Sequence, residues 1–236
     1  MKYYDHYVSR PRNQLGVRAK LYQARRLFEL GVGAAASEPM TILEIGPGDG
    51  YIADLAAARH HQYFAIEASE TIAASLRNRG YRVHQGFVPP LPPEPEAIDA
   101  CFALHVIEHM QTAQAAVEFV TAIRDRMRPG GTLVIATPDF ARWKTHFYDS
   151  DYTHVLPFTA RRLRQLLQAA DMSVVYESLY VGPVFGYLGV PFAWLASVLY
   201  TATVDDVLRK LVPRDIASRG FLTILPNLIA VAKRNS

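Results

Sequence analysis

The feature that most constrains the fold of this chain is a repeated alternation of short apolar runs with amphipathic segments. After most of the runs, apolar residues recur every three or four positions, which is the pattern of a helix packed on a sheet. Strands that are apolar throughout and alternate with such helices are typical of a parallel sheet covered on both faces. The sequence therefore predicts an α/β fold with a seven-stranded, mostly parallel sheet. The expected strands are 40–45, 62–66, 81–84, 97–104, 132–136, 172–176 and 228–232.

The same pattern predicts how the chain is divided. The expected helices cover residues 14–30, 51–59, 69–79, 113–127 and 159–170, and a proline-rich run at 88–95 is expected to be a loop. We expect four parts: an N-terminal helical arm (1–38), an α/β core (39–178), an apolar insertion (179–222) and the final strand of the core (223–236).

Composition excludes several classes of protein. Half of the 236 residues are hydrophobic and a fifth are charged, which excludes a disordered chain. The single cysteine, Cys101, excludes an internal disulfide and a cysteine-based zinc site. The N-terminus lacks the apolar stretch of a secretory signal, so a cytoplasmic location is expected.

Charge says little about partners. Residues 1–40 hold seven Lys or Arg against three Asp or Glu, while the whole chain has a net charge of +3. This basic arm is either an ordinary solvated helix or a surface that attracts phosphates or anionic lipid. The surplus is too small for DNA as a partner, and RNA is not the leading expectation.

Three glycines after the first strand predict a ligand site. Gly46, Gly48 and Gly50 follow that strand directly, and parallel sheets bind ligands at the carboxyl ends of their strands. The dinucleotide fingerprint would place its third glycine where this chain has Tyr51, so a nicotinamide enzyme is not favoured. Glu44, just before the loop, is suited to the amino group of a small cationic ligand.

Glu67 ends the second strand, where a carboxylate can accept hydrogen bonds from both hydroxyls of a ribose. The alternative is a structural turn with an unrelated glutamate. The order strand, glycine loop, helix, strand, acid favours the ribose.

With these residues in view, the chain resembles the class I S-adenosylmethionine-dependent methyltransferases, in particular bacterial enzymes that modify small molecules and saccharides. The resemblance lies in ILEIGPGDG, in Glu67, in IDACFALHVIEHM and in RMRPGGTLVIATPDF, and it covers about residues 40–178 and the last strand. It implies a Rossmann-like fold, S-adenosyl-L-methionine as cofactor, and methyl transfer to an oxygen of a small-molecule, saccharide or lipid-linked acceptor.

The resemblance also implies which residues hold the cofactor. Glu44 and the Gly46–Gly50 backbone would hold the methionine part, Glu67 the ribose, Gln85, Gly86 and Phe87 the adenine, while Leu104 and His105 would lie near the sulfonium. Pro47, Tyr51 and Ala68 complete the implied cofactor-binding set. Phe87 stands where the family often has an acid.

A hydroxyl acceptor benefits from a base, and His105 at the end of the fourth strand is the best-placed candidate. His109 lies one helical turn further on, and it either shares this role or packs the start of a helix. An amine acceptor needs no base and only has to arrive neutral.

A second possibility involves a metal. Small-RNA terminal 2′-O-methyltransferases carry an E-x-x-E-H segment and a later histidine that bind a divalent metal; Glu108 and His109 match it, and His105 replaces the first glutamate. His146 or His154 could be the later ligand. Our leading expectation assigns no metal, and the alternatives are such a metal-dependent RNA methyltransferase or a regulatory module that binds the cofactor without turnover.

The long aromatic segment after the fifth strand is expected to be functional. Asp151 and His154 could form a carboxylate–imidazole pair over the acceptor, which makes them catalytic candidates together with His105. The alternative is a loop clamp, with Asp151 capping a turn and His154 bonded to backbone. Its aromatic residues could stack on a sugar or pack the loop: Trp143, Phe147, Tyr148 and Tyr152.

Residues 178–204 contain no charge. Glycines and prolines interrupt this run, and the chain must return to add its last strand, so a membrane span is not favoured. It is a lid over the acceptor, our first choice, or a peripheral membrane contact, or a homodimer surface. Its aromatic residues Tyr187, Phe192, Trp194 and Tyr200 suit all three.

Overall fold

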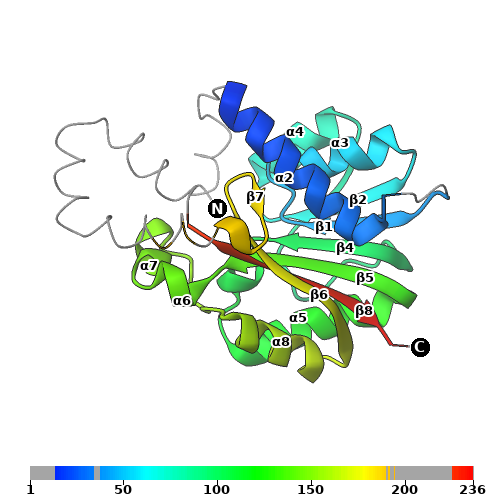
Figure 1. Ribbon diagram of the computed structural model, residues 1–236. Coiled ribbons are helices and arrows are strands. Elements are labelled where there is room, and N and C mark those ends of the chain that lie inside the picture. Colours follow the sequence, from blue (N-terminus) through cyan, green and yellow to red (C-terminus); the bar gives the residue numbers. More distant parts are fainter. Residues whose placement is uncertain (1–13, 35–37, 190, 192–193, 195–224, 236) are drawn as a thin grey trace.

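An eight-stranded sheet forms the centre of the molecule, in the order β3-β2-β1-β4-β5-β8-β6-β7 (Figure 1). The structure is a computed structural model and describes residues 14–34, 38–189, 191, 194 and 225–235. The strands are β1 (Thr41–Ile45), β2 (Gln62–Glu67), β3 (Arg82–Gln85), β4 (Ile98–Leu104), β5 (Met127–Pro138), β6 (Met172–Val181), β7 (Val184–Phe185) and β8 (Asn227–Arg234).

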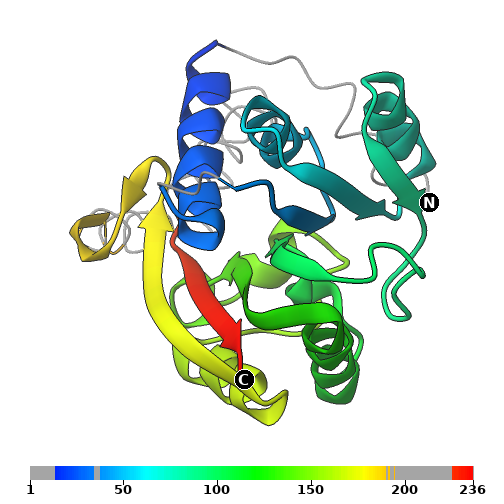
Figure 2. The ribbon, with the colours of Figure 1, turned by 90° about the vertical axis from the view of Figure 1, so that its right-hand side faces the viewer.

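Helices cover both faces of the sheet, as Figures 1 and 2 show. On one face, Phe28 of α2 and Ala53 of α3 are fully buried in one apolar cluster with Phe102 of β4. On the other face, Phe119 of α5 and Leu167 of α8 are buried in a second cluster. The helices are α2 (Gln14–Val32), α3 (Tyr51–Ala58), α4 (Glu70–Asn78), α5 (Ala113–Arg126), α6 (Phe140–Trp143), α7 (His146–Ser150) and α8 (Ala160–Ala169), with 3₁₀ turns η1 (Ile107–His109) and η2 (Tyr187–Gly189).

The strand order has a switch point beside β1. β1 pairs in parallel with β2 on one side and with β4 on the other, so the order of the strands reverses beside β1. Ligands of open α/β sheets bind outside the carboxyl ends of the strands at such a switch point. The glycine loop and His105 follow β1 and β4 there.

The predicted α/β fold with a mostly parallel sheet is confirmed, but the count of seven strands is wrong. β6 was expected to end at 176; it continues to Val181, because Ser178, Leu179 and Tyr180 pair with β8. Gly182, with a φ of +53°, then reverses the chain into the additional strand β7. An apolar run that sequence alone assigns to the insertion thus still belongs to the sheet.

A second difference concerns the end of α5. Residue 127 was expected to close that helix, and Pro129-Gly130-Gly131 to be a turn after it. The helix ends at Arg126, and Met127 instead pairs with Ile98 as the first residue of β5. Met127 is 1% exposed, so burial of its side chain against β4 accounts for the earlier start of the strand.

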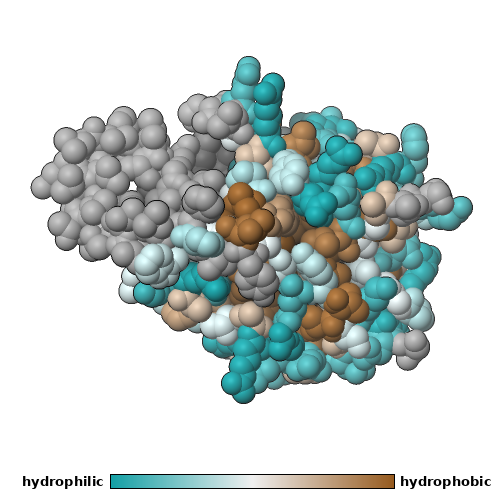
Figure 3. Space-filling view, in the orientation of Figure 1, coloured by the Kyte–Doolittle hydropathy of each residue, from teal (hydrophilic) through white to brown (hydrophobic). Residues whose placement is uncertain are grey.

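The beginning of the predicted insertion is apolar at the surface. Val184 and Leu188 are exposed, and Figure 3 shows apolar surface around the β6–β7 hairpin. Most of the insertion, with Phe192 and Tyr200, lies outside the described residues, as do residues 1–13 of the arm. In the part of the chain that the structure describes, we find no helix long and apolar enough to span a membrane.

Candidate functional site

The glycine loop turns sharply out of β1. Gly46, Gly48 and Gly50 have φ values of +67°, +51° and +78°, the left-handed region that side chains with a Cβ rarely adopt. The Gly50 N–H donates to the Pro47 carbonyl at 2.9 Å, which closes the turn. A Cβ added at Gly48 would meet nothing within 4 Å, so this glycine borders open space.

Gly50 has a different role. It is buried at the start of α3, where an added Cβ would lie 2.6 Å from Leu76 Cδ2 and 2.8 Å from an Arg79 guanidinium nitrogen. Gly50 therefore lets the start of α3 lie close to Leu76 and Arg79 at the end of α4, whereas Gly48 leaves room for a ligand. Tyr51 is the first residue of α3 and packs against the cluster below the loop.

Glu67 lies where the ribose prediction requires it. Its side chain ends β2 and is 6% exposed, and one carboxylate oxygen accepts the Ser69 N–H at 2.8 Å. Burial raises the pKa of this carboxyl, although the backbone N–H groups of Ser69, Gly48 and Ala68 oppose that shift. Glu67 therefore touches the glycine loop, and a hydroxyl-bearing ligand at the loop would meet it.

Glu44 is buried one residue before the end of β1. Tyr63 donates its hydroxyl to Glu44 Oε2 at 2.5 Å. Burial raises the Glu44 pKa to about 8, and the hydrogen bond from Tyr63 offsets this only in part. The carboxyl is thus largely protonated at neutral pH, and a cationic amino group beside it would favour its ionised form.

The residues expected at the adenine follow β3. The Gly86 N–H donates to the Glu67 carbonyl at 2.9 Å, and Gln85 Nε2 donates to the Ala68 carbonyl at 3.2 Å. Phe87 is 63% exposed. Its ring is therefore accessible to a planar ligand.

His105 is held at the carboxyl end of β4 in a left-handed conformation, with a φ of +58°. Its backbone N–H donates to the Ala136 carbonyl at 2.8 Å. Its Nδ1 lies 3.3 Å from Glu108 Oε1, and its Nε2 lies 2.8 Å from the Tyr180 hydroxyl. The side chain is 43% exposed, so the imidazole is both oriented and accessible.

Glu108 determines the tautomer of this imidazole. It is fully buried, which tends to raise the pKa of its carboxyl, but the hydrogen bond and charge of His105 and the charge of His109 hold the pKa below its usual range. An ionised carboxylate only accepts hydrogen bonds, so Nδ1 of His105 carries the proton. Nε2 is then the acceptor for the Tyr180 hydroxyl.

Two partners of the His105–Glu108 pair were not predicted from the sequence. One is Tyr180. The other is Thr137, whose hydroxyl donates to Glu108 Oε2 at 3.1 Å. Tyr180 belongs to the part of β6 that was assigned to the insertion. Thr137 lies just beyond the expected end of the fifth strand. No signal in the sequence showed that strand pairing would extend to either residue.

The structure does not form the predicted Asp151–His154 pair. Asp151 accepts the Thr153 N–H at 2.9 Å and the Thr153 hydroxyl at 2.6 Å. His154 Nδ1 lies 2.7 Å from the Phe147 carbonyl instead. This is the loop-clamp alternative. It arises because a carboxylate readily accepts hydrogen bonds from the backbone N–H and the hydroxyl of a threonine two residues later. Their catalytic role stays a prediction.

The loop after α7 is bonded to η1. His109 Nδ1 lies 2.9 Å from Thr153 Oγ1, and the Glu108 carbonyl accepts the N–H groups of Val155 and Leu156, each at 2.9 Å. These bonds bring side chains of Glu108, His109 and His154 together, with one possible ligand atom of each within 4.8 Å of the others. The other candidate, His146, is not in this group.

The aromatic residues of the same loop divide into two pairs. Trp143 and Phe147 are buried, and Trp143 Nε1 donates to the Pro226 carbonyl at 2.7 Å. They pack the loop, as one alternative expected. Tyr148 and Tyr152 are exposed and can contact an acceptor.

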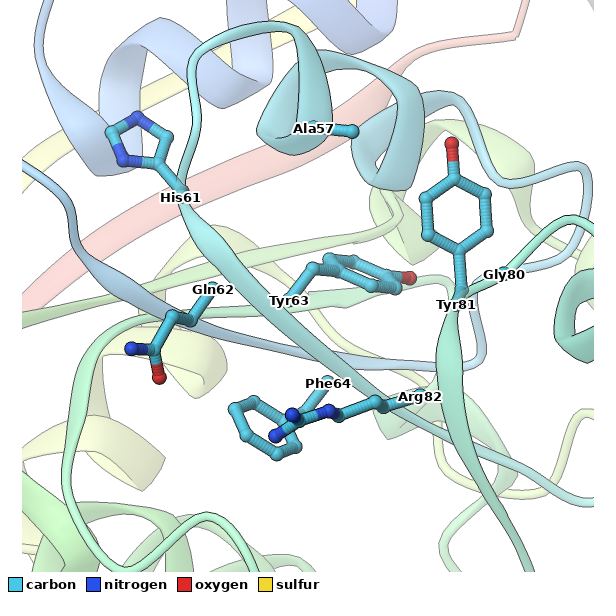
Figure 4. Close-up of a pocket in the computed structure, with 8 residues that line it drawn as sticks. All are labelled: Ala57, His61, Gln62, Tyr63, Phe64, Gly80, Tyr81 and Arg82. Atoms are coloured by element: carbon cyan, nitrogen blue, oxygen red, sulfur yellow. The ribbon is translucent and has the colours of Figure 1, made fainter.

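A cavity of about 410 Å³ lies elsewhere, at the amino ends of β2 and β3 (Figure 4). Its walls include His61, Tyr63 and Arg82. Because the glycine loop and His105 follow the carboxyl ends of their strands, this cavity is not part of the candidate site.

The strand order, the glycine loop and the acid that ends β2 are the features that the resemblance to methyltransferases predicts. A family model described as a methyltransferase domain matches residues 17–177. The chain belongs to this methyltransferase domain family, as the sequence predicted.

Related proteins agree with this assignment. A Mycobacterium tuberculosis protein named a probable S-adenosylmethionine-dependent methyltransferase is 31% identical over 150 residues, which cover 60% of this chain and 52% of the relative. The chain thus spans about half the length of the curated relatives it matches. The names of these relatives agree with the predicted cofactor.

Solved structures confirm the fold. An S-adenosylmethionine-dependent methyltransferase from Mesorhizobium loti has a TM-score of 0.61 at 11% identity, with 92% of this chain and 98% of that chain covered. A Burkholderia thailandensis 1,6-didemethyltoxoflavin-N1-methyltransferase, bound to its acceptor and S-adenosylhomocysteine, has a TM-score of 0.55 at 21% identity, covering 93% of this chain and 81% of that chain.

Proposed function

We propose that this protein transfers a methyl group from S-adenosyl-L-methionine to a hydroxyl oxygen of a small molecule, a saccharide or a lipid-linked acceptor. The observation that carries the proposal is the Glu108–His105 pair at the carboxyl end of β4, with Nδ1 3.3 Å from Glu108 Oε1. The cofactor supplies an activated methyl group on a sulfonium. The glycine loop and Glu67 fit its binding, because Gly48 borders open space and Glu67 touches the loop.

The pair suits a hydroxyl acceptor. With Nδ1 protonated and bonded to Glu108, Nε2 of His105 is the basic atom and accepts a hydrogen bond from Tyr180 at 2.8 Å. An acceptor hydroxyl that replaces the Tyr180 hydroxyl would give its proton to Nε2. The buried charge of Glu108 would then stabilise the imidazolium, as a carboxylate does in a catalytic triad.

A nitrogen acceptor is the second candidate. The name of the Burkholderia thailandensis neighbour states methylation at N1 of its acceptor. An amine that arrives neutral needs no base, so N-methylation would leave the Glu108–His105 pair without a chemical role. For that reason we favour oxygen.

The test uses purified protein, methyl-labelled S-adenosylmethionine and an extract of the source cells, partitioned between organic and aqueous phases. We expect acceptor-dependent transfer of label, and an O-methyl product by mass spectrometry. Label in the organic phase identifies a lipid or lipid-linked acceptor, and label in the aqueous phase a polar one. No transfer in any fraction would contradict catalysis, and an N-methyl product would contradict the choice of oxygen.

A further inference from the structure

The group of Glu108, His109 and His154 has the composition of a transition-metal site. One possible ligand atom from each lies within 4.8 Å of the others, and the two imidazole rings have centroids 5.0 Å apart. Glu108 is fully buried, while both histidines are partly accessible. An ion could therefore reach the group from solvent.

All three side chains are oriented by further hydrogen bonds. His154 Nδ1 lies 2.7 Å from the Phe147 carbonyl, so that nitrogen donates and Nε2 carries the lone pair. His109 Nδ1 lies 3.1 Å from the Thr153 carbonyl, which implies the same tautomer. Metal-binding histidines in proteins almost always donate their other ring N–H in this way, and metal-binding carboxylates are themselves hydrogen-bonded.

The carboxylate meets that condition too. Glu108 Oε2 accepts the Thr137 hydroxyl at 3.1 Å, and Oε1 lies 3.3 Å from His105 Nδ1. Each carboxylate oxygen has two lone pairs, so these bonds leave room for a metal bond. Ligand atoms around a tetrahedral ion lie about 3.3–3.6 Å apart, and one possible ligand atom of each group already lies within 4.8 Å of the others.

We propose that Glu108, His109 and His154 bind one divalent first-row transition-metal ion. Two imidazoles and one carboxylate suit zinc, iron, manganese, cobalt or nickel, whereas magnesium and calcium prefer oxygen ligands. The ion would join η1 to the loop after α7, which the Glu108 carbonyl already binds through Val155 and Leu156. Three protein ligands leave a coordination position for water or another oxygen.

The test measures metal binding directly. The full chain is treated with EDTA, dialysed and titrated with Co²⁺, whose visible absorption reports the ligand geometry, and with Zn²⁺ in a calorimeter. We expect one equivalent of each metal to bind. His109→Asn and His154→Asn should each lower the affinity by at least about tenfold, the smallest loss usual even for a change beside a ligand.

His60→Asn is the matched control. His60 is exposed after α3 and has a φ of +58°, a conformation that asparagine tolerates, so this change removes a histidine without strain. It should leave metal binding unchanged. Circular dichroism and binding of S-adenosylhomocysteine verify that each variant is folded.

Two results would overturn the proposal: a wild-type protein that gives neither a cobalt spectrum nor heat with zinc, or folded His109→Asn and His154→Asn variants that bind like the wild type. Loss of affinity in His60→Asn as large as in the other variants would also overturn it, because the binding would then be unspecific. The measurement needs no methyl transfer, so its result is independent of the proposed function.

Discussion

The two halves of the candidate site differ in how far apart along the chain their parts lie. Around the glycine loop, Glu67 bonds to Ser69 two residues away, and Glu44 to Tyr63 19 residues away. Around His105, Glu108 is three residues away, but two other partners are distant: Tyr180 is 75 residues from His105, and Thr153 is 44 residues from His109.

This difference follows from how each half is built. Consecutive elements from β1 to the end of β3 carry the cofactor half, so its geometry depends on local turns and on the pairing of neighbouring strands. The acceptor half depends on β8 lying between β5 and β6, which brings Tyr180 to the sheet. The first half should therefore govern cofactor affinity, and the second half turnover.

The largest expected effect is on turnover. His105→Asn removes the proposed base and keeps a residue that tolerates a φ of +58°. The rate of methyl transfer in a single turnover should fall by roughly 10²–10⁴-fold, the usual contribution of a general base. Affinity for S-adenosylhomocysteine, measured by calorimetry, should change little; an unaltered rate would mean that the protein gives the acceptor no help with its proton.

The second effect is on the free energy of unfolding, and it concerns Glu44 in the cofactor half. Glu44 holds its proton up to about pH 8 when folded but has an ordinary pKa of 4.5 when unfolded. The folded state thus binds this proton more tightly, and the stability it contributes is complete below pH 4.5 and lost as pH rises through 8. Glu44→Gln should remove this loss, which is on the order of 5 kcal/mol for a pKa that rises from 4.5 to about 8.

Urea unfolding of the wild type and of Glu44→Gln, on both sides of this pH range, measures the difference. Glu67 has a raised pKa as well, but it is unchanged in the variant and cancels. Parallel stability curves for the two proteins would show that Glu44 has no raised pKa.

The third effect is on cofactor affinity. Glu67→Ala should weaken binding of S-adenosylhomocysteine by about 10–100-fold, the value of one or two hydrogen bonds to a charged group. Glu70→Ala is the control, because Glu70 is exposed at the start of α4 and its side chain bonds with Arg77. Equal affinities for wild type and Glu67→Ala would remove Glu67 from the ribose site.

The sequence predicted where the residues of the cofactor half lie relative to the strands, because the signals for this half are local. The glycine-rich turn directly follows a buried strand in the sequence, and the acid stands at the end of the next strand. The positions of Gly46, Gly48 and Glu67 relative to the strands therefore agree with expectation. The role of Gly50 in helix packing could not be predicted, since it depends on where Leu76 and Arg79 lie.

The acceptor half was predictable only in part. The end of β4 at Leu104 identified His105, but the Asp151–His154 spacing left a side-chain pair and a loop clamp open. Three residues of separation allow a side-chain pair and a loop clamp equally, and local backbone groups decide between them. Tyr180 was out of reach because an apolar run does not show whether it pairs with a distant strand.

The smallest expected effect tests whether histidine or tyrosine takes the proton. Tyr180→Phe removes the hydroxyl at Nε2 of His105, so the free energy of unfolding should fall by about 1 kcal/mol. Burial raises the pKa of Tyr180 and keeps its hydroxyl protonated, so it cannot serve as the base at neutral pH. The rate should therefore change by less than tenfold, since the acceptor hydroxyl takes the place that Tyr180 leaves. A loss as large as in His105→Asn would mean that the proton passes through Tyr180, and the base would then be the His105–Tyr180 pair.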